Sequence, residues 1–139
     1  MKEEILFVHV IVPKGEINDV WDQVKDQARR TNDEFLDEND IKYLLELGEY
    51  VLWLVKEPHT NEIVAVITLD FAYYIKHKIG RVVTCAGYRM NEWLDQFLEE
   101  AEEWARANGC SHMDMYGRKG WKKVLKQYKE ECTLFRKKL

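Results

Sequence analysis

The sequence predicts a mixed α/β fold, with a mostly antiparallel central sheet of about six strands flanked by four helices. Two observations carry this prediction. Apolar, β-branched runs of strand length recur in the first part of the chain, and amphipathic helical periods alternate with short strand-like runs after residue 90. With 139 residues, of which 46% are hydrophobic, the chain can bury one core, so we expect a single domain spanning 1–139.

The N-terminal third predicts a strand and two helices. Residues 5–12 are apolar and β-branched, and the turn formers at 13–15 end this first strand. From residue 16 onward the apolar positions recur at helical spacing until the polar stretch 31–33. The stretch Asp37-Glu38-Asn39-Asp40 offers capping side chains for a second, shorter helix that ends near Gly48.

The middle of the chain predicts three strands. The runs 50–56 and 62–74 are joined by five residues rich in turn formers, so they should form a hairpin. A polar break at 76–80 then precedes a fourth strand at 81–86.

The helix expected at 91–108 has the clearest pattern in the chain, and Gly109 supplies a left-handed stop. Its apolar stripe consists of Trp93, Leu94, Phe97, Leu98, Ala101, Trp104 and Ala105. We expect a short strand at 110–115, a further amphipathic helix at 119–128, and a closing strand at 131–139.

Composition limits the classes of function. Cys85, Cys110 and Cys132 are odd in number and lack CxxC spacing, which is typical of reduced thiols in a cytosolic protein. The chain has no apolar run of about 20 residues and no signal sequence in residues 1–12, so we expect neither export nor membrane attachment. No histidine has ligand partners at metal-site spacing, so we expect no metal.

The net charge of -4 is unevenly distributed. Residues 1–70 carry 7 Lys or Arg and 16 Asp or Glu, and residues 71–139 carry 14 and 9, which gives -9 and +5. This split either orients an anionic ligand or an acidic partner, or is ordinary solvated surface. Lysines cluster in the helix expected at 119–128, but the acidic net charge and the lack of an aromatic RNA-binding motif argue against nucleic acid.

Several motifs in the last third of the chain resemble a known family. They are Trp104-Ala105-Arg106, Gly109-Cys110, Gly117-Arg118-Lys119-Gly120-Trp121 and the terminal Lys137-Lys138-Leu139. Together with the order of elements, they resemble the GNAT acyltransferase superfamily, and most closely the GNAT-like accessory proteins of tailed phages. The resemblance implies a phage product in the host cytoplasm or in the virion. Within the glycine cluster, Trp121 can anchor a tight turn, and Arg118 can contact a ligand or serve as a structural anchor.

The same resemblance implies a cofactor site. In GNAT enzymes the loop after the fourth strand holds the pyrophosphate of acetyl-CoA at a helix N-terminus through backbone amides. The corresponding residues are Gly87, Tyr88, Arg89, Met90 and Asn91, with Arg118 as a further contact. The family's glycine-rich loop is otherwise absent. Glu92 and Asp95 place negative charge nearby, which either opposes phosphates or stabilises the helix N-terminus.

Candidate catalytic residues are fewer. The tyrosine that protonates the leaving thiolate in the family corresponds to Leu125, which cannot donate a proton. Tyr116 and Tyr128 are the possible replacements, although each also fits a half-buried aromatic residue with a hydrated hydroxyl. His112 and Asp114 alternate on a strand and therefore share one face, where they can act as a general base or simply meet solvent.

Two functions remain open on the sequence. One is an N-acyltransferase that uses acetyl-CoA or another acyl-CoA through a degenerate pyrophosphate loop. The other is a non-catalytic phage accessory or virion-associated protein that keeps the fold and binds another phage or host protein. Trp53, Tyr73 and Tyr74 can face such a partner or belong to the core. The sequence names neither the acyl acceptor nor the oligomeric state.

Overall fold

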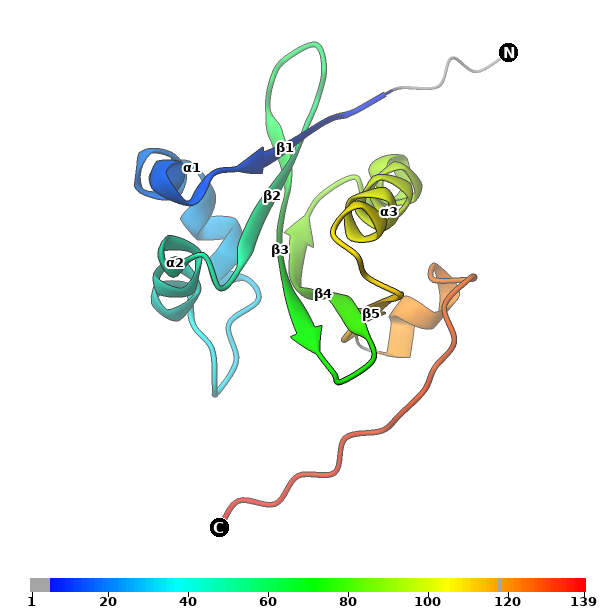
Figure 1. Ribbon diagram of the computed structural model, residues 1–139. Helices are drawn as coiled ribbons and strands as arrows, with labels where there is room; N and C mark the ends of the chain where they lie inside the picture. Colours follow the sequence, from blue (N-terminus) through cyan, green and yellow to red (C-terminus); the bar gives the residue numbers. More distant parts are fainter. Residues whose placement is uncertain (1–5, 118) are drawn as a thin grey trace, which may run out of the picture.

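The computed structural model describes residues 6–117 and 119–139, which form one sheet with helices on both faces (Figure 1). The strands are β1 (Val8–Val12), β2 (Val51–Lys56), β3 (Ile63–Tyr73), β4 (Lys78–Gly87) and β5 (His112–Met115), and the helices are α1 (Ile17–Arg29), α2 (Glu38–Leu47) and α3 (Met90–Ala107). Two short 3-10 helices are η1 (Lys14–Glu16) and η2 (Lys119–Lys123). None of the helices in this part of the chain is long and apolar enough to cross a membrane.

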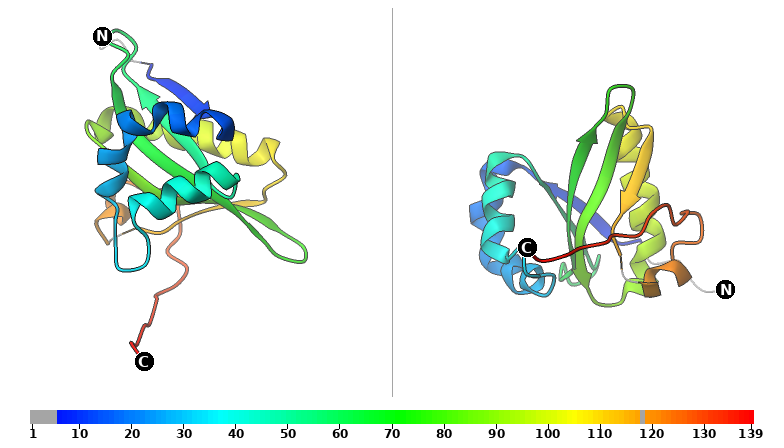
Figure 2. Two further views of the ribbon diagram at one scale, coloured as in Figure 1. Left: turned by 90° about the vertical axis from the view of Figure 1, so that its left-hand side faces the viewer. Right: turned by 90° about the horizontal axis from the view of Figure 1, so that it is seen from below.

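The sheet has the order β1-β2-β3-β4-β5. The first three pairings are antiparallel, and the last, between β4 and β5, is parallel. This confirms the predicted mixed, mostly antiparallel sheet. Figure 2 shows α1 and α2 side by side on one face of the sheet and α3 on the other.

The sheet therefore separates two cores. The core on the α3 face includes Trp53, Ile67, Leu69, Val82, Trp93 and Phe97, and the core on the α1–α2 face includes Trp21, Val24, Ile41, Leu45, Leu54 and Val66. The predicted stripe of α3 is confirmed, because five of its seven members are buried and Leu98 and Trp104 pack at the border of the core. Residues 64–69 of β3 are buried throughout, since both of their faces are covered.

The predicted helix boundaries follow from local chemistry. The Asp37 carboxylate accepts hydrogen bonds from the backbone amides of Asn39 and Asp40, and the Asp40 carboxylate accepts one from the backbone amide of Asp37, which completes a capping box. Gly48 ends α2 with a φ of 80°, and Gly109 follows α3 with a φ of 81°, a left-handed conformation that favours glycine.

The hairpin of β3 and β4 is longer than predicted, because β4 begins at Lys78 and not at Arg81. Arg81 donates two hydrogen bonds, of 2.8 and 2.6 Å, to the Asp70 carboxylate on β3. The Lys78 ammonium lies 4.2 Å from the centroid of the Phe71 ring, which in turn stacks on Trp104 of α3 at 4.9 Å. Lysine therefore belongs to this strand, since its stem covers aromatic surface.

The predictions for the C-terminal segment are wrong in part. The helix expected at 119–128 is only the short η2, and the strand expected at 131–139 does not form, so the described residues hold three α-helices and five strands. Every residue of 131–139 is exposed. Leu134 and Phe135 are adjacent and would point to opposite faces of a strand, so this segment has no apolar face to bury.

The packing of α3 on the sheet can be tested at Phe97, which is fully buried and meets the ring of Trp53 edge-on at 5.5 Å. We expect Phe97→Ala to lower the free energy of unfolding by about 3 to 5 kcal/mol, because it removes buried surface and leaves a cavity. The exposed Phe135 provides the matched control, since Phe135→Ala removes the same atoms without a cavity. Urea unfolding measures both, and a loss below about 1 kcal/mol for Phe97→Ala would contradict this packing.

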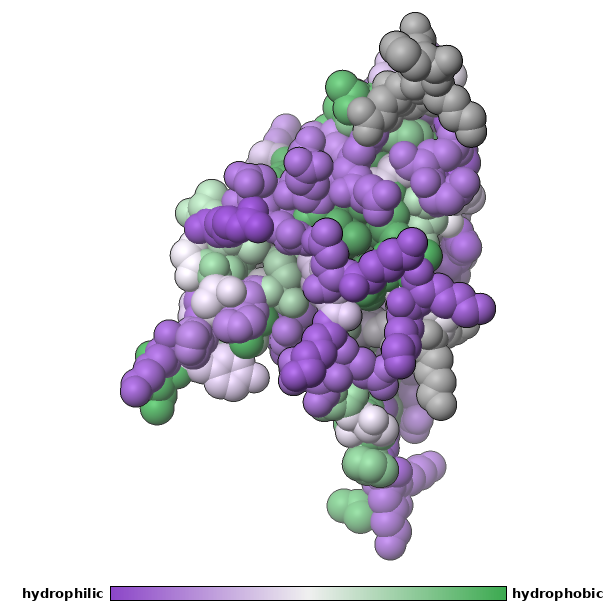
Figure 3. Space-filling view, turned by 90° about the vertical axis from the view of Figure 1, so that its right-hand side faces the viewer, coloured by the Kyte–Doolittle hydropathy of each residue, from purple (hydrophilic) through white to green (hydrophobic). Residues whose placement is uncertain are grey.

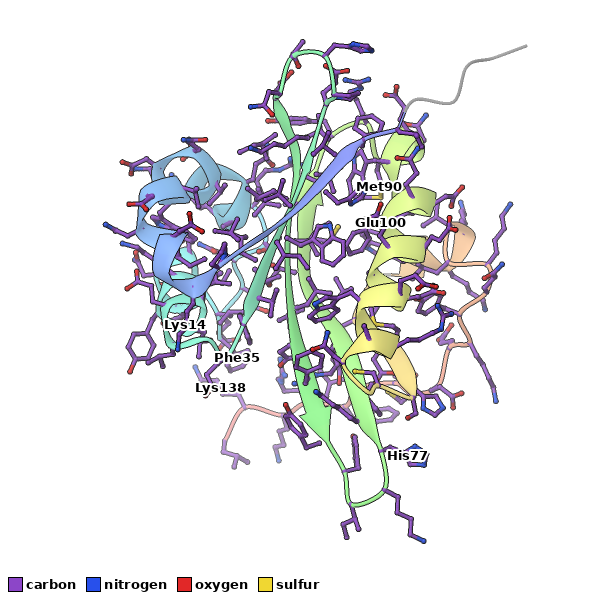
Figure 4. All side chains as sticks on the ribbon, turned by 45° about the horizontal axis from the view of Figure 1, so that its top comes forward. Lys14, Phe35, His77, Met90, Glu100 and Lys138 are labelled. Carbon is purple, nitrogen blue, oxygen red and sulfur yellow. The ribbon has the colours of Figure 1, made fainter. Side chains whose placement is uncertain are left out.

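His9 on β1 is a half-buried titratable group that contacts Trp53 of the same core. Its Nδ1 accepts a hydrogen bond of 3.0 Å from the indole N–H of Trp53, and its Nε2 is buried without a hydrogen-bond partner among the described residues. Burial lowers the pKa of His9, and the negative charge of Glu100 on α3, labelled in Figure 4, opposes this with a smaller effect. The half-buried environment therefore favours the neutral form of the imidazole.

This burial predicts a pH dependence of stability. The unfolded chain protonates His9 near its ordinary pKa of about 6.5, whereas the folded chain resists protonation until a lower pH. The stability contributed by neutral His9 is therefore present above about pH 6.5 and is lost as the pH falls below it. His9→Asn keeps an acceptor for Trp53 but does not titrate. We expect the free energy of unfolding of His9→Asn, measured in urea, to fall less than that of the parent between pH 7.5 and pH 5.5. An equal fall in both proteins would show that His9 does not cause the pH dependence.

Candidate functional site

A β-bulge in β4 marks the point at which β4 and β5 cease to pair, next to the candidate site. Thr68 of β3 pairs with Thr84, and Leu69 pairs with Val82, so Val83 is an extra residue in β4. β5 pairs with β4 only from Ile79 to Val82. Beyond the bulge, β4 therefore continues to its end without β5 beside it, and bulges of this kind are common next to active sites.

The turn from β4 to α3 is held firmly by backbone and indole contacts. The amide of Tyr88 donates to the carbonyl of Val64 at 2.9 Å, and the indole N–H of Trp93 donates to the carbonyl of Tyr88 at 2.7 Å. Arg89 has a φ of 61° and forms the N-cap of α3, but its side chain makes no capping hydrogen bond with a backbone amide of the helix. Tyr88, Arg89 and Asn91 are exposed, so the positive end of α3 is open to a ligand.

The first turn of α3 already contains an ion pair. The Arg89 guanidinium donates to the two carboxylate oxygens of Glu92 at 2.6 and 3.1 Å. These hydrogen bonds lower the pKa of Glu92 and raise that of Arg89. The guanidinium also lies 5.4 Å from the centroid of the Phe7 ring. The cation expected to meet phosphate is therefore already bound to a carboxylate of the same helix.

Gly87 has a steric role in the sheet. A Cβ atom at this position would lie 2.3 Å from the carbonyl oxygen of Val64 and 2.9 Å from the Cα of Ala65. Its φ is not positive, so the residue is not needed for a left-handed turn. The close approach of β3 to the end of β4 explains this glycine without a ligand.

A second group of candidates lines a cleft of about 330 Å³ between the C-terminal half of α3, β5 and residues 127–131. His112, Asp114 and Tyr128 all line this cleft, and His112 and Asp114 share one exposed face of β5, as their spacing predicts. The hydroxyl of Tyr128 donates to the Glu102 carboxylate at 2.9 Å. Burial and this carboxylate raise the pKa of Tyr128, so the hydroxyl holds its proton firmly and is a weak acid.

Sequence reasoning missed two residues at the edge of this cleft. The hydroxyl of Ser111 lies 2.9 Å from Nδ1 of His77 and 2.8 Å from Nδ1 of His112, so it bridges two imidazoles. The two rings meet edge-on at 5.6 Å. His77 and His112 are far apart in sequence, and the parallel pairing of Ile79 with His112 brings them together. No local spacing could have indicated this cluster.

The remaining candidates lie elsewhere. Tyr116 is exposed just beyond β5. Hydrogen bonds with Asp70, and to a smaller extent with the hydroxyl of Tyr116, raise the pKa of the Arg81 guanidinium. Arg118 lies outside the described residues. A Cβ on Gly117 would lie 2.7 Å from the ring of Trp121, which packs on the α3 core, so this cluster serves as a structural anchor.

The structure does not bring the two groups together. Met90 marks the N-terminus of α3, whereas the cleft begins at Glu102, about 18 Å further along a helix that rises 1.5 Å per residue. Figure 4 shows the same separation, with Met90 and His77 toward opposite ends of the molecule. Cys85, between the two groups, has its pKa raised to about 12 by burial and so is not a nucleophile at neutral pH.

Comparison with known proteins identifies the fold. No protein-family profile and no curated sequence matches the chain. Among solved structures it is similar to a GNAT family acetyltransferase from Staphylococcus aureus subsp. aureus USA300_TCH1516, with a TM-score of 0.68, 15% identity, and coverage of 96% of this chain and 98% of that chain. The chain has the fold of the GNAT acetyltransferases.

Other GNAT-fold structures align equally fully. The alignment with an aminoglycoside 6'-N-acetyltransferase from Acinetobacter baumannii has a TM-score of 0.67 and 13% sequence identity. It covers 96% of this chain and 99% of the chain of that enzyme. Glucosamine-6-phosphate N-acetyltransferase from Arabidopsis thaliana has a TM-score of 0.68 and 11% identity, with coverage of 96% and 98%. The GNAT fold thus accounts for nearly the whole chain, and at these identities the likeness concerns the fold alone.

The steric role of Gly87 can be tested by adding one methyl group. We expect Gly87→Ala to lower the free energy of unfolding by about 1 to 3 kcal/mol, because its Cβ would displace the carbonyl of Val64. Gly120→Ala is the matched control, since a Cβ there meets nothing within 4 Å. Thermal and urea unfolding measure the difference. If both variants are as stable as the parent, the glycine is not there for packing.

Proposed function

We propose that the protein is a phage-type GNAT N-acyltransferase that takes an acyl group from acyl-CoA and transfers it to an amine. The observation that carries this proposal is the bulge at Val83, beyond which β4 no longer pairs with β5. β4 then continues into the N-terminus of α3, which has no side-chain cap. A helix N-terminus of this kind favours an anionic ligand. The similarity to GNAT acetyltransferases supports the same conclusion.

The residues at this junction fit the pyrophosphate of CoA. The backbone of Tyr88 to Asn91 would hold it, because three of these four residues are exposed and the helix end carries partial positive charge. Acyl-CoA, when bound, supplies an activated acyl group on a thioester. Glu92 opposes this binding, since its carboxylate lies in the first turn of α3 and occupies the Arg89 guanidinium.

Proton transfer is assigned to the cleft on β5. His112 and Asp114 line it and are exposed, so an amine can reach them, and the imidazole of His112 is the kind of side chain that acts as a general base. Tyr128 has a positioning role, because its hydroxyl is bound to Glu102 and resists giving up its proton. The pantetheine arm of CoA separates pyrophosphate from thioester, so the two groups need not be in contact.

The ion pair of Arg89 with Glu92 favours a second candidate function. In that case the chain is a non-catalytic phage accessory or virion-associated protein that has the GNAT fold and binds another phage or host protein. The pairing leaves no cation in the first turn of α3 free for phosphate, and Tyr128 is likewise engaged. The two functions differ in whether CoA binds.

Calorimetry with acetyl-CoA and free CoA separates them. We expect the parent to bind acetyl-CoA more tightly than about 100 μM, which corresponds to roughly -5.5 kcal/mol. Glu92→Gln removes the opposing charge and releases Arg89, so it should strengthen binding about twofold to fivefold at low salt. Glu103→Gln is the matched control, because Glu103 forms a comparable ion pair with Arg106 at the other end of α3.

The outcomes are distinct. If neither the parent nor Glu92→Gln takes up CoA at millimolar concentration, the acyltransferase proposal fails and the non-catalytic function replaces it. If Glu92→Gln and Glu103→Gln change affinity equally, the ligand does not bind at the α3 N-terminus. Release of free CoA thiol with a panel of amines, compared between the parent and His112→Asn, then tests the general base.

A further inference from the structure

The β3–β4 hairpin forms an arm that extends past the rest of the sheet. β2 pairs with β3 only as far as Leu69, and β5 pairs with β4 only from Ile79. We call residues 70–79 the arm. The strand residues 70–73 alone add about 13 Å beyond β2, at about 3.3 Å per residue. Figures 1 and 2 show this two-stranded ribbon projecting from the body of the molecule.

Contacts at the base of the arm fix its direction. A two-stranded hairpin without such support is only marginally stable in water. Here the paired hydrogen bonds between Arg81 and Asp70 join the two strands, and the stack of Phe71 on Trp104 ties the arm to α3. Lys78 also donates to the carbonyl of Asn108 at 2.9 Å. The arm is therefore held in position before any partner arrives.

The tip of this rigid arm exposes apolar side chains. Tyr73 and Tyr74 are 74% and 65% exposed, and Ile75 is fully exposed. In Figure 3 the arm is the projection at the lower left, where hydrophobic atoms lie beside hydrophilic ones. The tip also carries Lys76, and no Asp or Glu occurs between Asp70 and Glu92 in the sequence. A partner for this tip must offer apolar surface together with negative charge.

The outer face of α2 has that chemistry. Tyr43 and Leu47 are 64% and 51% exposed and lie four residues apart, so they form one apolar strip on the helix. Glu46 and Glu49 are exposed beside it, and Glu46 forms an ion pair of 3.5 Å with Lys42 on the same helix. This acidic strip belongs to the half of the chain with a net charge of -9, and the arm belongs to the half with +5. One chain thus contains both complementary surfaces.

The two surfaces also lie at the same end of the molecule. α2 ends at Leu47, and β2 begins four residues later at Val51, which pairs with Leu69 immediately before the arm. Tyr50, between them, is close enough to Asp70 and Arg81 for their charges to affect its pKa, which burial raises. Figure 2 shows the C-terminal end of α2 and the arm on the same side.

We propose that the arm of each protomer packs on α2 of a second copy, which gives a symmetric dimer. Ile75 and Tyr74 cover the strip of Tyr43 and Leu47, and Lys76 faces the glutamates beside it. Both surfaces lie at one end of the molecule. The arm of each protomer can therefore pack on α2 of the other about a two-fold axis, and the assembly closes at two copies. The charge difference between the halves makes a second copy the fitting occupant.

Sedimentation velocity tests the dimer. As the protein concentration rises from about 5 to about 500 μM, a range suited to a small interface, we expect the parent to shift from monomer to dimer. About 0.5 M salt should weaken this association. Ile75→Asp on the arm and Leu47→Asp on α2 should each weaken it at least tenfold. Leu134→Asp is the control, because Leu134 is also an exposed apolar residue but lies on the C-terminal segment, so this substitution should leave the dimer unchanged.

Four results would overturn the proposal. They are a monomer across the whole range, a dimer that neither Ile75→Asp nor Leu47→Asp weakens, a dimer that Leu134→Asp weakens equally, and an assembly larger than two. A monomer that binds vesicles of phosphatidylglycerol and phosphatidylcholine through Ile75 would assign the arm to an anionic membrane instead. Melting temperatures confirm that the exposed substitutions leave the fold intact. The test is independent of CoA binding, so its result does not depend on the proposed activity.

Discussion

The single extra residue in β4 determines both cores and the position of the candidate site. Side chains alternate along a strand, so one inserted residue reverses the faces of all that follow. Val82 and Cys85 consequently both face the α3 core although they are three positions apart. Beside the bulge, the hydroxyls of Thr68 and Thr84 are buried and hydrogen-bond each other at 2.5 Å, so neither polar group is left unsatisfied.

The sequence predicted the elements that rest on local patterns and failed where tertiary pairing decides. The stripe of α3 and the helix cap expected within 37–40 are local, and both are confirmed. The bulge was missed because Val82 and Val83 are both valine, so the inserted residue leaves no trace in the apolar pattern. The strand expected at 131–139 was wrong; Leu134 and Phe135 are adjacent and cannot share a face of a strand.

For the candidate site, the position of the cofactor loop was predictable and its chemistry was only partly so. The loop follows the fourth strand, whose existence the sequence indicates. Arg89 and Glu92 are three residues apart on a helix, a spacing that itself favours an ion pair. In contrast, the close contact of Gly87 with Val64 and the bridging of two imidazoles by Ser111 depend on strand register, which no single stretch of sequence contains.

Charge explains why the two ends of β4 differ. The strand lies within a stretch free of Asp and Glu, and the residues that bound it, Asp70 and Glu92, each bind an arginine of that stretch. At the α3 end this pairing takes up Arg89, the cation nearest the proposed phosphate site, so anion binding there depends on backbone amides. At the arm, the described residues include no carboxylate bound to Lys76. Positive charge therefore remains available at the arm and is largely neutralised at the α3 N-terminus. Electrostatic attraction thus contributes more to binding an acidic protein surface at the arm than to binding a phosphate at the α3 N-terminus.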